Sequence, residues 1–84
     1  MTHILTLRTR YDVQNEITED VNHTVGSYGR CPTVALIKKV CIHYFKTFGV
    51  TSVTVTHEGG EYTVVRNYDD GEVQINVLTL DAHG

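Results

Sequence analysis

Residues 32–49 read PTVALIKKVCIHYFKTFG, and this stretch decides the fold. Pro32 suits a first helical turn because it has no N–H to satisfy, and Gly49 suits a left-handed cap. Between them, apolar side chains recur at helical spacing and form one stripe, which consists of Val34, Ile37, Cys41, Tyr44, Phe45 and Phe48. The sequence therefore predicts an amphipathic helix over residues 33–48.

Alternating segments lie on both sides of this helix. Period-two alternation of apolar and polar residues is typical of half-buried strands. It runs through residues 3–13, 51–57, 62–68 and 72–80. Between the last three segments, the glycine-bearing stretches EGGE and DDG predict tight hairpin turns. The residues after 80 are expected to form a frayed tail.

Residues 14–30 allow two interpretations. Ile17, Val21 and Val25 are spaced four apart, as in a short helix, but they are also all odd-numbered, as on one strand face. Thr, Asn and Val are poor helix formers, so we favour a strand in a hairpin. The predicted order is ββαβββ, or βαβββ if this segment is no strand. Either order predicts an α+β fold, with one helix packed on a mostly antiparallel four- to five-stranded sheet.

The length and the charge of the chain limit the classes of protein to which it can belong. Eighty-four residues predict a single domain over residues 1–84. Seven basic and ten acidic side chains give a net charge of −3, which disfavours non-specific binding to nucleic acid. No basic stretch precedes an apolar run near Met1, no segment is long enough to span a membrane, and two cysteines do not make a disulfide framework. We therefore expect a cytoplasmic protein in a reducing environment.

A glycine-bearing loop, the cysteine at its end and five histidines are the features that could carry chemistry. The loop GSYGRC at 26–31 precedes the helix, where it could bind an anion or make Cys31 nucleophilic. The five histidines lack metal-site spacing, although His57 could join Glu58 and Glu61 around a turn. An ordinary connection and surface histidines explain these features more simply. We predict no catalytic residue, metal ligand or cofactor, and keep an enzyme or anion-binding domain built on Cys31 as an alternative.

The sheet offers the most informative surface. We expect the helix to cover the face that bears Val53, Val55, Tyr62, Val64, Val73, Ile75 and Val77. The opposite face is then polar but largely uncharged, as in the core of a protein interface, and acidic turns flank it. An ordinary solvated face fits the pattern equally well. The predicted contact residues are Glu58, Glu61, Thr63, Val65, Asn67, Asp69, Asp70, Glu72, Gln74, Asn76 and Leu78.

In size, acidity and fold class, the chain resembles small phage-encoded inhibitors, among them anti-CRISPR proteins and host-takeover factors. The resemblance rests on these general properties and on no particular residue. It implies a non-enzymatic protein-binding module that occupies a surface of a partner handling nucleic acid, with the acidic turns facing basic groups. A homodimeric structural or regulatory subunit, paired through an open sheet edge or face, is the other alternative. Direct binding to nucleic acid or to a membrane is not expected.

Overall fold

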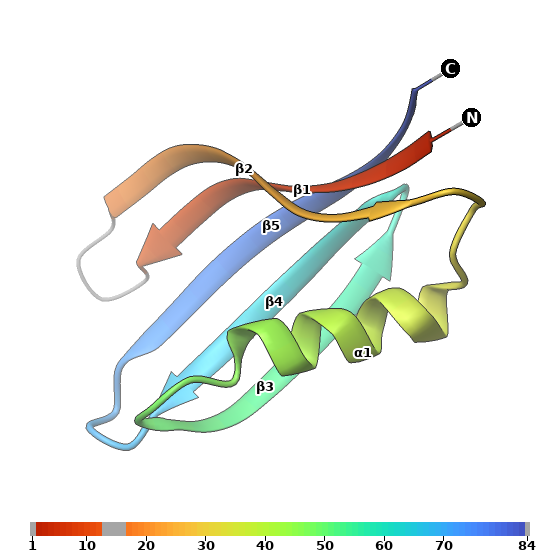
Figure 1. The fold of residues 1–84 in the computed structure, drawn as a ribbon. Helices are drawn as coiled ribbons and strands as arrows, with labels where there is room; N and C mark the ends of the chain where they lie inside the picture. The colour runs from red at the N-terminus through yellow and green to blue at the C-terminus, as the bar shows by residue number, and fades with distance from the viewer. Residues whose placement is uncertain (1, 13–16, 84) are drawn as a thin grey trace.

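The computed structural model describes residues 2–12 and 17–83 and has the element order ββαβββ (Figure 1). All paired strands are antiparallel, and the sheet order is β2-β1-β5-β4-β3. This confirms the predicted α+β class, with five strands. The elements are β1 (Thr2–Asp12), β2 (Ile17–Tyr28), α1 (Val34–Phe45), β3 (Val50–Glu58), β4 (Glu61–Tyr68) and β5 (Val73–His83).

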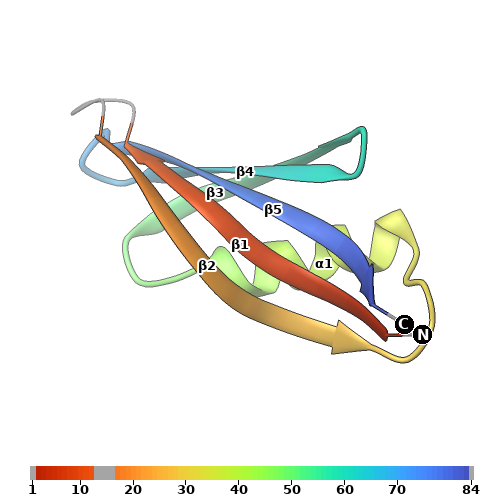
Figure 2. The same cartoon turned by 90° about the horizontal axis from the view of Figure 1, so that it is seen from above.

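The helix connects the two edge strands of the sheet. β2 and β3 lie at opposite edges, so the chain between them must cross one face, and α1 makes that crossing. Figures 1 and 2 show α1 on a single side of the twisted sheet, where it packs mainly over β3 and β4. We call this side the covered face and the other side the open face. No element of the described chain lies on the open face.

The helix begins as local chemistry requires, but it ends earlier than predicted. Thr33 is the N-cap, and its side-chain oxygen accepts a hydrogen bond from the Leu36 N–H at 3.1 Å. Pro32 thus precedes the cap and is not in the first turn. The last helical residue is Phe45, and the Lys46 N–H donates to the Ile42 carbonyl.

The predicted apolar stripe is wrong at three of its six positions. Val34 and Tyr44 are exposed, and Phe48 lies beyond the helix with a fully exposed side chain (102%). Phe48 is exposed because the chain has already left the helix and forms a turn in which the Val50 N–H donates to the Thr47 carbonyl. Gly49 has a φ of +86° as expected for glycine, but it serves this turn and not the helix cap.

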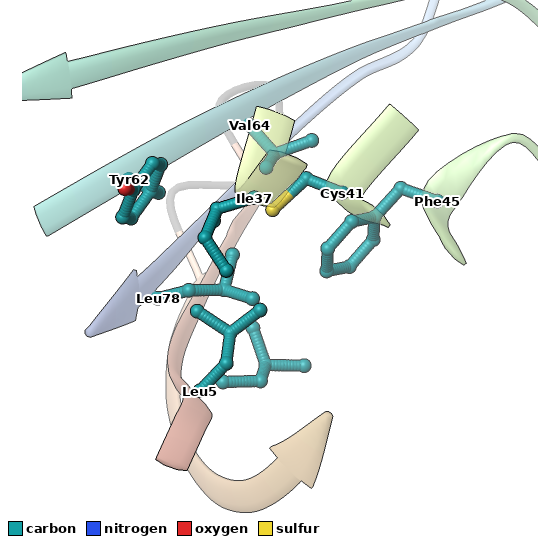
Figure 3. Close-up of a cluster of buried hydrophobic side chains, with 8 residues drawn as sticks. Leu5, Ile37, Cys41, Phe45, Tyr62, Val64 and Leu78 are labelled. Atoms are coloured by element: carbon teal, nitrogen blue, oxygen red, sulfur yellow. The ribbon is translucent and has the colours of Figure 1, made fainter. Parts of the chain in front are cut away.

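The core lies between α1 and the covered face. Ile37, Cys41 and Phe45 are spaced four apart on the helix and are all buried. Figure 3 shows these side chains pointing at residues from three strands. Each fully buried large apolar side chain contributes about 1.5–3 kcal/mol relative to exposure. The buried strand residues of this cluster are Leu5, Leu7, Tyr62, Val64 and Leu78.

The structure decides two further predictions, which concern residues 14–30 and the residues after 80. The ambiguous segment forms the strand β2 from Ile17 onward, and the predicted strand residue Val13 lies outside the described residues, as do residues 14–16. The predicted frayed tail is wrong, because β5 continues to His83. Its last residues pair with the start of β1, from His83 opposite Thr2 onward, so backbone hydrogen bonding holds both ends of the chain together.

Candidate functional site

The structure divides the predicted contact residues among two turns and both faces. Glu58 and Glu61 bound the β3–β4 turn, while Asp69, Asp70 and Glu72 lie at the β4–β5 turn, at the opposite end of β4. Figure 1 shows the two turns at opposite ends of the sheet. Eight residues of β4 separate them, which corresponds to about 25 Å.

The predicted face of β4 is correct. Tyr62 and Val64 are buried against the helix. Successive side chains of a strand alternate between faces, so the neighbours Thr63, Val65 and Asn67 lie on the open face, where all three are half-buried.

The predicted face of β5 is wrong. Leu78 pairs with Tyr62 and also with Leu7 of β1, and all three side chains are buried under the helix. Gln74 and Asn76 share the parity of Leu78 and therefore lie on the covered face. Shifting a strand by one residue moves its whole set of side chains to the other face. The three predicted contact residues of β5 are thus unavailable to a partner at the open face.

The open face is more apolar than predicted. Val73, Ile75 and Val77 of β5 pair with Asn67, Val65 and Thr63 of β4, and the β5 residues were expected in the core. They form a half-buried apolar patch on the open side. Hydroxyl-bearing residues of neighbouring strands surround it, namely Thr6, Thr9, Thr54, Thr56, Thr63 and Thr79.

The β3–β4 turn places two carboxylates opposite each other. Glu58 and Glu61 are direct register partners and both are exposed. Like charges opposite each other across a strand pair cost on the order of 0.2–1 kcal/mol. A hollow of about 420 Å³ lies here, lined by Thr56, His57, Glu58, Gly59, Glu61 and Thr63. The His57 ring packs on Tyr62, with ring centroids 4.6 Å apart.

Metal chemistry receives no structural support at this turn. The hypothesis joined His57 with the two glutamates, but residues 2–12 and 17–83 contain no group of three His, Cys, Asp or Glu side chains placed to hold a metal ion.

The β4–β5 turn carries carboxylates next to an exposed aromatic side chain. The Asp70 carboxylate accepts a hydrogen bond from the Glu72 N–H at 2.9 Å, which holds the turn. The Asp69 N–H donates to the Gly49 carbonyl, also at 2.9 Å, and so ties the turn to the loop after α1. Phe48, which the helical pattern had assigned to the core, therefore lies exposed at the acidic end of β4.

A polar cluster that the sequence did not indicate lies under the C-terminal end of α1. The Arg66 guanidinium donates to the Gln74 side-chain oxygen and lies 5.2 Å from the Phe45 ring centroid and 5.7 Å from that of Tyr68. Burial is the largest cause that lowers the pKa of Arg66, and the nearby charge of Arg10 adds to it.

Asn76 is the buried polar residue of the described core. Its side chain is 1% exposed, and neither amide atom has a hydrogen-bond partner within the described part of the chain. The Arg66 Nε also lacks one there. Unpaired buried polar atoms reduce stability, so this region contributes less to folding than its burial implies.

The two cysteines have different environments. Cys31 is exposed, its thiol lies 3.8 Å from the Pro32 carbonyl, and it lines a mainly apolar hollow of about 430 Å³ with Tyr28, Arg30 and Leu36. Cys41 is buried in the core as predicted, and burial raises its pKa to about 11. Cys41 is therefore a thiol at neutral pH, and only Cys31 is accessible.

Comparison with protein-family models, with curated proteins and with solved structures finds no match for this chain. In the described part of the chain, no helix has the length and apolar character needed to cross a membrane. The geometry of the site is therefore the basis for the function proposed below.

Proposed function

We propose that this chain is a non-enzymatic protein-binding module whose contact surface is the open face of the sheet. The observation that carries the proposal is the apolar patch on that face, which α1 leaves uncovered. Its centre is formed by Val65, Ile75 and Val77 on two neighbouring strands, each half-buried. The uncharged register partners Thr54, Thr63 and Thr9 flank Val65 and Val77. Depletion of charge around apolar side chains is the compositional mark of an interface core.

The charges around the patch indicate the kind of partner. Acidic residues lie at both ends of β4, and Glu58 opposes Glu61 although the like charges repel. A basic group on a partner would relieve this repulsion and gain a charge-assisted contact at the same place. Basic surfaces are typical of proteins that bind nucleic acid. We therefore propose that the module inhibits a nucleic-acid-handling protein, as the resemblance to phage-encoded inhibitors implies.

Phe48 supplies an aromatic anchor for such a contact. Its side chain is fully exposed, and the adjoining turn carries Asp69 and Asp70. Aromatic residues are enriched among the few side chains that dominate binding energy at interfaces. An exposed phenylalanine has no core contacts to lose, so its replacement separates binding from folding.

Affinity capture of the tagged chain from lysate of its native cell or host, with and without nuclease, tests the proposal. We expect a stoichiometric protein that survives nuclease treatment and is lost with Ile75→Glu or Phe48→Ala. His43→Glu, on the exposed side of α1, is the matched control and should retain the partner. Retention of the partner by Ile75→Glu would remove the open face from the proposal, and retention by Phe48→Ala would remove the aromatic anchor.

The acidic turns are tested separately through kinetics. Reversing the charges of Glu61 and Asp69 should slow association with the captured partner and weaken its salt dependence, because rim charges act mainly on encounter. Unchanged association would exclude the turns from the contact.

The hollow before α1 supports one second candidate, a small enzyme or anion-binding domain. Arg30 and Cys31 both line it, so a ligand there would meet a cation and a thiol. If Cys31 reacts with a thiol probe no faster than free cysteine does, the enzymatic version of this candidate fails.

A further inference from the structure

The two edges of the sheet differ in how they are protected. β2 has two irregularities in its pairing with β1, a positive φ of 50° at Asn22 and an exposed carboxylate at Asp20. Bulges and charges of this kind discourage further strand pairing. β3 is regular from Ser52 to Glu58 in its pairing with β4, and residues 50–56 contain neither a charged residue nor proline. The β3 edge is thus the unprotected one.

The covered side of the β3 edge is an incomplete apolar layer. Val53 and Val55 pack at the margin of the core but remain half-buried, because no strand lies beyond them. Their neighbours Ser52, Thr54 and Thr56 are exposed on the open side. A further strand would cover the valines and pair with backbone groups that β3 offers at its free edge.

One flank of α1 borders this edge. Ile37 and Cys41 point into the core. Leu36, one residue before Ile37, shares a hollow with Tyr28 of β2, so the flank of α1 that bears Leu36 faces toward β2. The opposite flank of α1 therefore faces β3, against which the helix packs. The β3-side flank contains Lys38, which follows Ile37, and Ile42, which follows Cys41.

The β3-side flank combines one apolar residue with two positive charges. Ile42 is 41% exposed, and Lys38 and Lys46 lie one turn before and after it. Neither lysine forms an ion pair within residues 2–12 and 17–83. An added strand would therefore meet Ile42 and two ammonium groups above the β3 valines. This arrangement selects for carboxylates on the partner.

We propose that the β3 edge binds an extended segment of a partner protein, which adds a sixth strand and directs acidic side chains toward Lys38 and Lys46. This contact is separate from the open face, so it stands whether or not the open-face proposal holds. A second copy of the chain fits less well. Two-fold pairing of β3 with itself would keep both helices on one side and set the lysine-bearing flanks against each other.

The test uses a nine-residue blocked peptide of sequence TETVTVTET and the full 84-residue chain. We expect saturable amide chemical-shift changes in an NMR titration, concentrated in β3 and on the β3-side flank of α1, with slower amide exchange in β3. The same peptide with lysine for glutamate should bind about tenfold more weakly. A version N-methylated on the alternate amides that face β3 should not bind, since it cannot complete the ladder, and methylation of the other alternate set should leave binding intact.

Two variants of the chain sharpen the charge argument. Lys38→Glu should weaken binding of the TETVTVTET peptide about fivefold or more, and Lys39→Glu, the same charge change on the solvent side of the helix, should stay within about twofold. No saturable shifts at millimolar peptide, or equal binding of the glutamate and lysine peptides, would overturn the proposal. Concentration-dependent dimerisation with protected β3 amides would overturn it in favour of a second copy.

Discussion

The two faces of the sheet are built from the same strands but do different things. The covered face holds buried Leu5, Val64 and Leu78 against α1, while the open face holds Val65 and Ile75 half-buried with no layer above them. Apolar side chains are therefore not a sufficient guide to the core in this protein. The difference shows that the helix commits one face to stability and leaves the other available for contact.

The strongest test of this comparison is a pair of substitutions at adjacent residues of β5. Leu78→Ala removes a fully buried side chain and should lower the free energy of unfolding by about 2–5 kcal/mol, measured by urea denaturation. Val77→Ala, on the open face, should cost about 1 kcal/mol or less. If both variants lost the same free energy of unfolding, the open face of the sheet would have to be covered by protein in solution, as the covered face is.

A second pair makes the same chemical change on β4. Val64→Thr places a hydroxyl in the buried core at nearly constant volume and should cost about 1–3 kcal/mol. Val65→Thr presents the hydroxyl on the open side and should stay within about 0.5 kcal/mol. If thermal unfolding ranks the two variants in the opposite order, the assignment of faces on β4 is wrong.

The covered face also contains a residue whose replacement should stabilise it. Asn76→Leu removes two buried amide atoms without partners, so we expect the free energy of unfolding to rise by about 1–2 kcal/mol. Gln74→Leu, on the same strand and face, should instead cost about 1 kcal/mol, because Arg66 loses its acceptor. A loss of stability with Asn76→Leu would contradict the view that its amide is unpaired.

The last test is a pH dependence of stability that arises from Cys41. In the unfolded chain the thiol ionises near pH 9, whereas burial raises its pKa to about 11 in the folded state. The folded state therefore binds this proton more tightly. Its contribution is complete below pH 9 and is lost progressively as the pH rises toward 11.

Cys41→Val is the comparison protein. The pKa values of half-buried Tyr28 and buried Tyr62 are raised mainly by burial, which both proteins keep, and to a smaller extent by the Cys41 charge, which the variant loses together with the thiol. Stability curves that stay parallel from pH 8 to pH 11 would show that the Cys41 site is hydrated.

Local chemistry accounts for the elements that sequence reasoning found. The four-residue spacing of Ile37, Cys41 and Phe45 and the glycine-bearing turns involve residues close together in the chain, so they can be read directly from the sequence. Capping by Thr33 is also local, but the prediction placed Thr33 inside the helix. The helix end was misplaced because Phe48 continues the apolar spacing although the chain has already turned. Tyr44 was misplaced as well, since periodicity does not show how wide a stripe the sheet covers.

The face of β5 could not be read from the chain by itself. Its sequence VQINVLTL offers apolar residues at both parities, so two registers satisfy the alternation. Pairing of Leu78 with Leu7 and Tyr62, and of Leu80 with Leu5, selects one of them. Only then do Asn76 and Gln74 turn inward and Ile75 outward, which moves three of the eleven predicted contact residues to the covered face.

The sequence alone determined the fold class, the helix, four of the five strands, the acidic turns and the exclusion of dense positive charge, because each depends on composition or on neighbours within a few residues. Whether the segment after the first strand is also a strand was left open by its sequence. The tertiary structure decided which face of β5 is buried, which sheet edge is left unprotected and where Phe48 and Lys38 lie. Those features depend on contacts between residues far apart in the chain. A local pattern is compatible with more than one such set of contacts.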